Sequence, residues 1–174
     1  IQKQFRFPTD KNNDFVYWGS DKTRTAGGEK SKDDRLDVIK YINKSENISS
    51  IIIGRWPFKV KEKWIPMKDT LGYLDQSYTT LCFNWIDQTA VTGRYPEALA
   101  CNIYPFVWKD YDTNNILVSD DFQRCFTKEE LYDKIKYIKN TNMLDKVKTD
   151  FIDKLPSEQE YYQDFEKVIN KCLK

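Results

Sequence analysis

Two short apolar runs, FVYWG at 15–19 and ISSIIIG at 48–54, each end in glycine and flank a polar segment with helical spacing. Short apolar runs that stop at a glycine are typical of buried strands followed by a loop. The alternation continues along the chain, with strands expected at 78–85, 104–109 and 115–120 and helices at 33–44, 67–76 and 94–102. Strands that alternate with helices predict an α/β fold with one parallel sheet and helices on both of its faces.

After the last of these strands, Thr127-Lys-Glu-Glu130 has the spacing of a capping box and predicts the start of a helix. The rest of the chain to Lys174 is expected to be helical, with a break at Leu155-Pro156. The predicted organisation is a linker at 1–14, one domain at 15–155 and a C-terminal helix at 156–174. Because a linker-like stretch opens the sequence, we expect another domain to precede it.

Composition excludes several classes of site. The 174 residues suit one domain, and 28 basic against 27 acidic residues exclude a nucleic-acid module driven by charge alone. The chain has no histidine and four widely spaced cysteines, which argues against a zinc site and excludes a Ser-His-Asp triad within this chain. Scattered cysteines are typical of a reducing compartment, and no long apolar run is present, so we expect a cytosolic protein without a membrane partner.

In a parallel α/β sheet, ligands bind at the carboxyl ends of the strands. Three positions are expected at that edge: Gly19-Ser20, Gly54-Arg55 and the turn before Arg94. Glycine there would let the backbone approach a ligand closely. The chain contains no GxGxxG and no Walker sequence, which disfavours NAD and ATP as ligands.

The first candidate motif is Arg94-Tyr-Pro-Glu97, at the start of an expected helix. Arginine offers a planar, permanently charged fork that suits phosphate, and a helix N-terminus favours anions. Glu97 follows one turn later, about 5 Å along the same face, where a carboxylate can accept hydrogen bonds from the vicinal hydroxyls of a ribose. The pair therefore fits a nucleoside diphosphate, and the alternative is a surface ion pair between the two side chains.

The second candidate is the loop from Gly19 to Asp34, which is followed by Arg35. Its Gly19-Ser20 turn allows close approach of a ligand, and Lys22, Arg24 and Arg35 supply cations near the same edge. The alternative is a solvated loop with ordinary basic residues.

The third candidate is the segment 55–66, in which basic residues alternate with aromatic ones. This pattern suits contact with nucleic acid, and the residues concerned are Arg55, Trp56, Phe58, Lys59, Lys61, Lys63 and Trp64. The alternative is a covering loop whose aromatic side chains close the core while its lysines are solvated.

Taken in order, these segments resemble the carboxyl-terminal half of the DNA β-glucosyltransferases of T-even bacteriophages. The resemblance runs from about Phe15 and is carried by Gly19-Ser20 with the following Arg35, Ile65-Pro66-Met67, Arg94-x-x-Glu97-x-x-Ala100, PFVWKDYD at 105–112 and Tyr162-x-x-Phe165. Members of that family have two Rossmann-like domains that face a cleft, and they transfer glucose from UDP-glucose to 5-hydroxymethylcytosine in DNA. Other two-domain sugar transferases also carry a glutamate in a P-E-A-L-A type run, as at 96–100 here.

The resemblance implies that this chain is the Rossmann-like, UDP-sugar-binding half of a glycosyltransferase. The implied ligand contacts are Gly19, Ser20, Lys22, Arg24, Arg35, Gly54, Ile65, Arg94 and Glu97. The loop from Asp21 to Asp34 is longer than that of the family, which leaves open whether Lys22 or Arg24 is the second phosphate cation. The family's catalytic base lies in the amino-terminal domain, so we expect no catalytic residue in this chain and no sugar transfer by the chain alone.

The resemblance also implies a setting and partners. The donor substrate would be UDP-glucose, double-stranded DNA would be reached through the complete enzyme with its missing amino-terminal domain, and the location would be the cytoplasm of an infected host cell. Mg²⁺ or Mn²⁺ would be an optional aid at the diphosphate, although the sequence shows no dedicated carboxylate cluster. The competing interpretation is a non-catalytic nucleotide- or nucleic-acid-binding module that uses Lys59, Lys61 and Lys63.

Overall fold

The computed structural model describes residues 11–19, 29–60, 65–84, 92–118, 120–139, 141–157, 159–160 and 163. The elements in chain order are β1 (Asn13–Trp18), α1 (Glu29–Lys44), β2 (Ser50–Ile53), α2 (Met67–Asp75), β3 (Ser77–Cys82), α3 (Arg94–Ala100), β4 (Tyr104–Trp108), η1 (Asp121–Gln123), β5 (Arg124–Cys125), α4 (Lys128–Ile138) and α5 (Met143–Asp153). The five strands form one sheet in the order β2-β1-β3-β4-β5, and every neighbouring pair is parallel.

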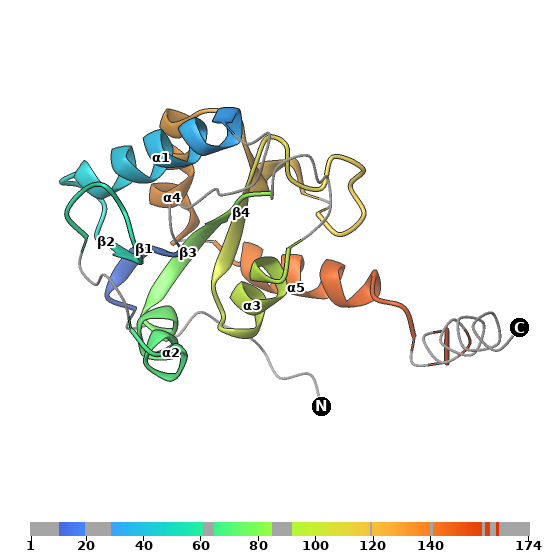
Figure 1. Cartoon of the computed structure of the whole chain (residues 1–174). Helices are drawn as coiled ribbons and strands as arrows, with labels where there is room; N and C mark the ends of the chain where they lie inside the picture. The colour runs from blue at the N-terminus through green and yellow to red at the C-terminus, as the bar shows by residue number, and fades with distance from the viewer. Residues whose placement is uncertain are drawn as a thin grey trace, which may run out of the picture.

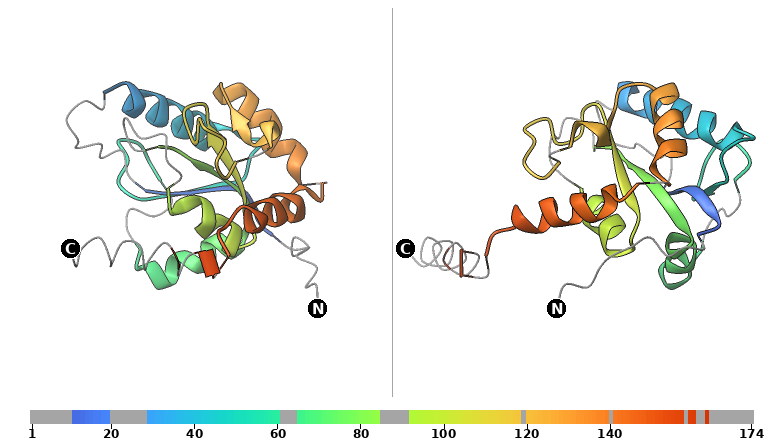
Figure 2. Two further views of the ribbon diagram at one scale, coloured as in Figure 1. Left: turned by 90° about the vertical axis from the view of Figure 1, so that its right-hand side faces the viewer. Right: turned by 180° about the vertical axis from the view of Figure 1, so that it is seen from behind.

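Helices cover the sheet on both faces (Figures 1 and 2). Helices α1 and α4 lie side by side on one face, and α2, α3 and α5 lie on the other. The strand β1 is buried along its whole length, with Phe15 and Tyr17 in one core cluster and Val16 and Trp18 in a second. The predicted α/β fold with a Rossmann-like parallel sheet and helices on both faces is confirmed.

The strand order fixes where a ligand can enter. The chain leaves β1 through α1 to reach β2 at the edge, and then crosses back through α2 to β3 on the other side of β1. The loops that follow β1 and β3 therefore diverge to opposite faces of the sheet. Doubly wound sheets bind ligands in the crevice that such a divergence leaves at the carboxyl ends of the strands.

Most expected elements lie within a few residues of the observed ones. Helix α1 begins at Glu29 rather than Asp33, because no helix breaker stands in the residues between them. The capping box is confirmed, since the Thr127 hydroxyl accepts a hydrogen bond from the backbone N–H of Glu130 at 3.1 Å. The Glu130 carboxylate in turn accepts one from the backbone N–H of Phe126 at 2.9 Å.

The strand predicted at 115–120 is wrong. The backbone N–H groups of Ile116, Leu117 and Val118 donate to the Asp112 carboxylate at 2.7–3.0 Å, so they cannot form a strand ladder. The fifth strand is the two-residue β5, which pairs with β4. A side chain four to six residues away has captured the donors that a strand would need.

The helical stretch expected from Thr127 onward has a break that the sequence analysis missed. Helix α4 ends at Ile138 and α5 begins at Met143. The backbone N–H and the hydroxyl of Thr141 both donate to the carbonyl oxygen of Ile138, at 3.1 and 3.0 Å. Threonine and asparagine side chains compete for backbone groups in this way, which favours helix ends over helix interiors.

The ends of the chain are described only in part. Strand β1 begins at Asn13, inside the predicted linker, and the buried Lys11 donates from Nζ to the carbonyl oxygens of Ser77 and Asn102 at 2.7 and 2.8 Å. Residues 1–10 and most of the predicted C-terminal helix at 156–174 lie outside the described residues. None of the helices in the described part of the chain has the length and apolar character that a membrane span requires.

Candidate functional site

A pocket of about 350 Å³ opens at the carboxyl ends of β1 and β3, where the strand order reverses. Its described lining comes from the end of β1, from α1, from the residue after β3 and from the start of α3: Tyr17, Gly19, Arg35, Phe83, Thr92, Gly93, Arg94 and Glu97. Four of the predicted contact residues, Gly19, Arg35, Arg94 and Glu97, thus meet in one pocket. Its volume lies at the lower end of the range of about 300–1,000 Å³ that small-ligand pockets occupy.

Arg94 lies across the end of β1. Its guanidinium carbon is 4.4 Å from the ring centroid of Trp18 and 5.3 Å from that of Tyr17. The Nη1 atom is buried, and it has no hydrogen-bond partner among the residues that the structure describes. Stacking fixes the plane of a guanidinium but leaves its in-plane N–H groups free to donate.

Arg35 reaches the same pocket from α1. Its guanidinium carbon lies 5.2 Å from the centroid of the Phe83 ring, and Nη2 donates to the carbonyl oxygen of Asn84 at 3.1 Å. Its Nε and the side-chain oxygen of Asn84 are both buried and lack a hydrogen-bond partner in the described part of the chain. Buried polar groups are rarely left in this state, and an acceptor group of a ligand in the pocket could satisfy such donors.

Glu97 is exposed at the rim of the pocket. Its Oε1 atom lies 3.7 Å from where a β-carbon on Gly93 would be, so the carboxylate folds back over the turn that begins α3. Among the described ion pairs none joins it to Arg94, so the surface pair considered above as the alternative is not formed in this conformation. Within the part of the chain that the structure describes, no ion pair occupies either the carboxylate or the guanidinium.

The described lining of the pocket carries a net positive charge. Arg35 and Arg94 contribute two guanidinium groups, and Glu97 contributes one carboxylate. The nearby Asp34 carboxylate is already engaged, because it pairs with Nζ of Lys109 at 2.9 Å and accepts from the Trp108 indole at 3.3 Å. Burial raises the pKa of the Cys82 thiol to about 12 despite the opposing effect of Arg94, so this side chain is neutral at pH 7. The site therefore suits an anionic ligand.

The two strand-end glycines differ in role. Gly19 has φ +156° and lines the pocket, and a β-carbon there would lie 3.3 Å from the Tyr17 ring and 3.7 Å from Nη1 of Arg94. Gly54 has φ +127° and faces the backbone of Gly19 rather than the pocket. The backbone N–H of Gly19 donates to the carbonyl oxygen of Ile53 at 3.0 Å, which holds the ends of β1 and β2 together.

The other predicted contacts lie elsewhere. Ile65 packs against the second core cluster, which includes Val16 and Ile51, and does not appear in the described pocket lining. Predicted contacts and nucleic-acid candidates outside the described residues are Ser20, Lys22, Arg24, Lys61, Lys63 and Trp64.

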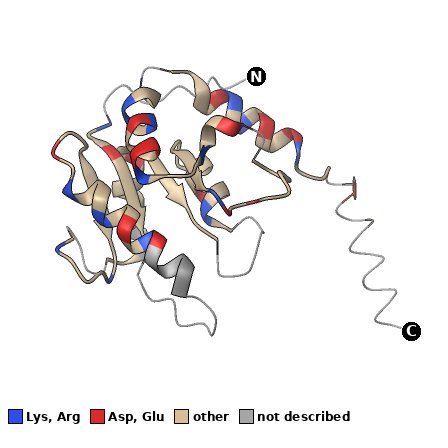
Figure 3. Ribbon diagram, turned by 90° about the horizontal axis from the view of Figure 1, so that it is seen from above, with Lys and Arg blue, Asp and Glu red and all other residues tan. Residues whose placement is uncertain are grey.

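The described half of the aromatic, basic segment behaves as a covering loop. The ring of Trp56 packs edge-on against that of Tyr17 with centroids 5.6 Å apart and at a tilt against that of Phe58 at 5.5 Å. Trp56 and Phe58 are partly buried against the first core cluster. Lys59 is exposed, and its backbone carbonyl accepts from Asn43 at 3.2 Å. Figure 3 shows acidic and basic residues interspersed along the helices on the side that it views.

Sequence reasoning missed two residues of the pocket, Tyr17 and Phe83, whereas Thr92 and Gly93 form the turn before Arg94 that was expected at this edge. Tyr17 and Phe83 lie at the carboxyl ends of strands that were expected, so their position on the chain was the available signal. Their side-chain direction could not be assigned without knowing which helix covers which face. Within the described residues no cluster of three or more Cys, Asp or Glu side chains could hold a metal ion.

Comparisons of this chain with protein-family models, with curated proteins and with solved structures find no match.

Proposed function

We propose that this chain binds the nucleoside diphosphate of a UDP-sugar and acts as the donor-binding domain of a glycosyltransferase. The observation that carries the proposal is the convergence of two guanidinium groups, each with a buried N–H group that lacks a described partner, in one pocket at the reversal of strand order. A diphosphate offers several charged acceptor oxygens to such donors. An exposed carboxylate on the rim supplies the acceptor that ribose hydroxyls need.

In this proposal Arg94 and Arg35 bind the diphosphate and Glu97 binds the ribose. Helix α3 has only seven residues, so we assign anion binding to the side chains rather than to the helix terminus. When the glycosidic bond breaks, negative charge develops on UDP, and fixed guanidinium groups stabilise it without having to reorient. A carboxylate on a partner domain would deprotonate the acceptor hydroxyl, and direct displacement would invert the anomeric centre.

The finer assignment rests on the resemblance to the phage enzymes. It makes glucose the sugar, a hydroxymethylated base in double-stranded DNA the acceptor, and the cytoplasm of an infected cell the setting. The pocket itself supports a nucleoside diphosphate with a free ribose, and the competing interpretation remains a nucleotide- or nucleic-acid-binding module. Binding measurements separate these two functions.

We expect calorimetric titration to detect binding of UDP to this chain. The affinities for ADP, GDP and NAD should be lower than the affinity for UDP. The proposed contacts to phosphate and ribose all lie within this chain, so the chain should bind without a partner domain. Single-stranded DNA provides the control, because a nucleic-acid module would bind it in the absence of UDP. Tighter binding of ADP or NAD than of UDP would contradict the uracil assignment, and DNA binding without UDP binding would favour the competing function.

Glu97→Ala is expected to weaken UDP binding by about tenfold, since hydrogen bonds to charged groups contribute about 1.5–3 kcal/mol and about 1.4 kcal/mol is a factor of ten. The loss should be clearly smaller for 2′-deoxy-UDP, which lacks one of the two hydroxyls. An exposed glutamate without a ligand would change stability by at most about 0.5 kcal/mol and leave every affinity unchanged. Equal losses for UDP and 2′-deoxy-UDP would rule out the ribose contact even if the chain binds nucleotides.

A further inference from the structure

The hydroxyl of Tyr111 is bonded to the turn that begins α3. It accepts a hydrogen bond from the backbone N–H of Thr92 at 2.8 Å, donates to the carbonyl oxygen of Thr92 at 3.2 Å, and lies 3.2 Å from the Thr92 hydroxyl. Thr92 and Gly93 line the pocket and directly precede Arg94. One phenol group, 19 residues away in the sequence, therefore holds the backbone from which the pocket arginine projects.

Tyr111 is itself held rigidly. The side chain is fully buried, and its ring stacks on that of Tyr95 with centroids 6.2 Å apart. Its backbone N–H donates to the carbonyl oxygen of Trp108 at 2.8 Å. Burial raises the pKa of the phenol above its ordinary value near 10, so the hydroxyl keeps its proton and can donate at neutral pH.

The loop that carries Tyr111 is closed by a buried carboxylate. Asp112 is fully buried, has φ 46°, and accepts the three backbone N–H groups of residues 116–118. The loop projects beyond the carboxyl edge of the sheet (Figure 1, yellow). An ionised carboxylate that accepts several backbone N–H bonds fixes a turn more firmly than neutral side chains do.

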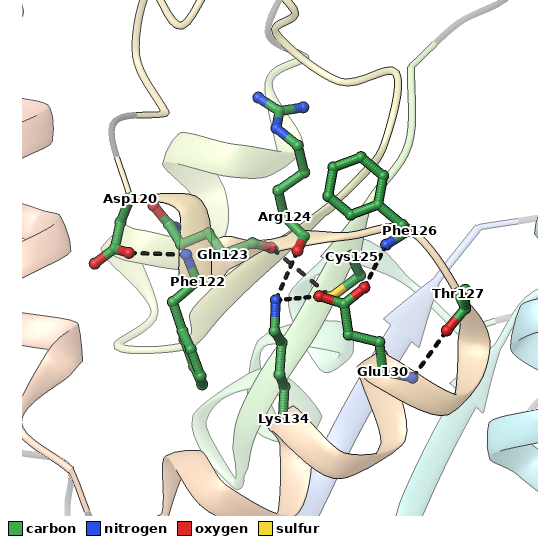
Figure 4. A network of polar contacts seen from close by, with 9 residues as sticks. All are labelled: Asp120, Phe122, Gln123, Arg124, Cys125, Phe126, Thr127, Glu130 and Lys134. Atoms are coloured by element: carbon green, nitrogen blue, oxygen red, sulfur yellow. Dashed lines mark hydrogen bonds and ion pairs between the residues drawn. The ribbon is translucent and has the colours of Figure 1, made fainter.

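Arg124 clamps the same loop from β5. Its guanidinium donates to the carbonyl oxygens of Lys109, Tyr111 and Asp112 and to the side-chain oxygen of Asn115. Behind it, the carbonyl oxygen of Arg124 accepts from Lys134 at 2.7 Å, and Lys134 pairs with Glu130 at 2.6 Å (Figure 4). The Tyr111 backbone is thus fixed to the sheet edge and to α4.

Among the described residues, no side chain caps the start of α3. Gly93 is its N-cap and offers no side-chain cap, and the helix is only seven residues long. Isolated helices of that length are not stable, so tertiary contacts must define where such a helix begins. Arg94 is the first residue of α3, and its guanidinium lies over the ring of Trp18. Any movement of the turn would therefore displace the guanidinium from this position.

We propose that Tyr111 is a positioning residue for the pocket arginine: its hydroxyl, held by the clamped loop, fixes the Thr92–Gly93 turn and with it the guanidinium of Arg94. The ligand that benefits is the diphosphate of the proposed function, on which this part of the inference rests. A group that is ordered before binding costs less conformational entropy when a ligand arrives, and so binds more tightly.

Tyr111→Phe tests the proposal, with Tyr95→Phe as its matched control. Both substitutions keep a buried aromatic ring and remove one hydroxyl, but the Tyr95 hydroxyl bonds to Gln123 at 3.1–3.2 Å and not to the turn. We expect Tyr111→Phe to weaken UDP binding by about tenfold, or ~1.4 kcal/mol, and to leave uridine binding unchanged. Tyr95→Phe should lower the unfolding temperature similarly while leaving both affinities near those of the wild type.

A readout without ligand distinguishes this inference from the proposed function. In ligand-free protein, ¹⁵N relaxation of the Arg94 Nε–H group should show lost order in Tyr111→Phe and retained order in Tyr95→Phe. Unchanged order of Arg94 in Tyr111→Phe, or equal losses of UDP affinity in the two variants, would overturn the positioning role. If wild-type protein bound no UDP, the proposed function would fail, and the order of Arg94 would still decide whether Tyr111 positions it.

Discussion

Arg94→Ala is expected to weaken UDP binding by about 100-fold and uridine binding hardly at all. The substitution removes a guanidinium that is stacked on Trp18 and Tyr17 and has a buried N–H without a described partner. Truncating one partner of a buried, hydrogen-bonded charge pair costs about 2–5 kcal/mol, and 100-fold corresponds to about 2.7 kcal/mol. Uridine lacks the diphosphate, so the affinity for uridine should be nearly the same in Arg94→Ala and in the wild type. Isothermal titration of both ligands measures the difference.

Arg55→Ala is the matched control for this prediction. It removes the same charge from an exposed residue just beyond the end of β2, outside the described pocket lining. Long-range attraction for an anion would fall in both variants and would be screened by salt, whereas a direct contact would be lost only in Arg94→Ala. Equal weakening of UDP by the two substitutions would show that Arg94 acts only through net charge and does not contact the diphosphate.

The fold could be predicted because its strongest signals are local. The run at 15–19 is apolar on both faces, as a central strand of a parallel sheet must be, and all six residues of β1 are buried. The start of α4 was equally clear, since the Thr127–Glu130 capping box depends only on neighbours in sequence. The strand predicted at 115–120 was wrong because a side chain outside that run determines its structure. The backbone N–H groups of residues 116–118 donate to the Asp112 carboxylate, and the apolar run itself does not indicate this.

The sequence predicted several residues of the candidate site, but it did not predict the residues that hold them in place. Arg94 and Glu97 form a local motif at the end of a predicted strand–loop unit, and the structure places both in the pocket. Arg35 was named as a cation near the loop that follows the first strand, but its contact with Asn84 joins residues 49 positions apart and could not be read from the sequence. Tyr111 was not predicted as a site residue, because the sequence alone does not distinguish it from a tyrosine of the hydrophobic core. Its hydrogen bond with Thr92 is visible only in the structure. Contacts between residues so far apart in sequence depend on the register of the strands and on which helix covers which face of the sheet, and neither is visible in the sequence.

Gly54→Ala is expected to lower the free energy of unfolding by about 4 kcal/mol or more, which is exceptional for one methyl group. The residue has φ +127°, a conformation that a side chain strains by roughly 1–3 kcal/mol. In addition, the new β-carbon would lie 1.5 Å from the carbonyl oxygen of Gly19 and 2.7 Å from its carbonyl carbon. Both are backbone atoms, so relief requires the ends of β1 and β2 to separate, which would also displace Gly19 from the pocket. Urea unfolding measures the change.

Two other glycines supply the comparison for Gly54→Ala. In α2, Gly72 has open space around its β-position, so Gly72→Ala should stabilise the protein by up to about 1 kcal/mol through helix propensity. Gly19→Ala should be intermediate, because its β-carbon would meet the Tyr17 side chain at 3.3 Å rather than backbone. The expected order of stability is therefore Gly72→Ala, wild type, Gly19→Ala and Gly54→Ala. A Gly54→Ala protein as stable as Gly19→Ala would show that the two strand ends can part freely, and that their contact does not fix the pocket rim.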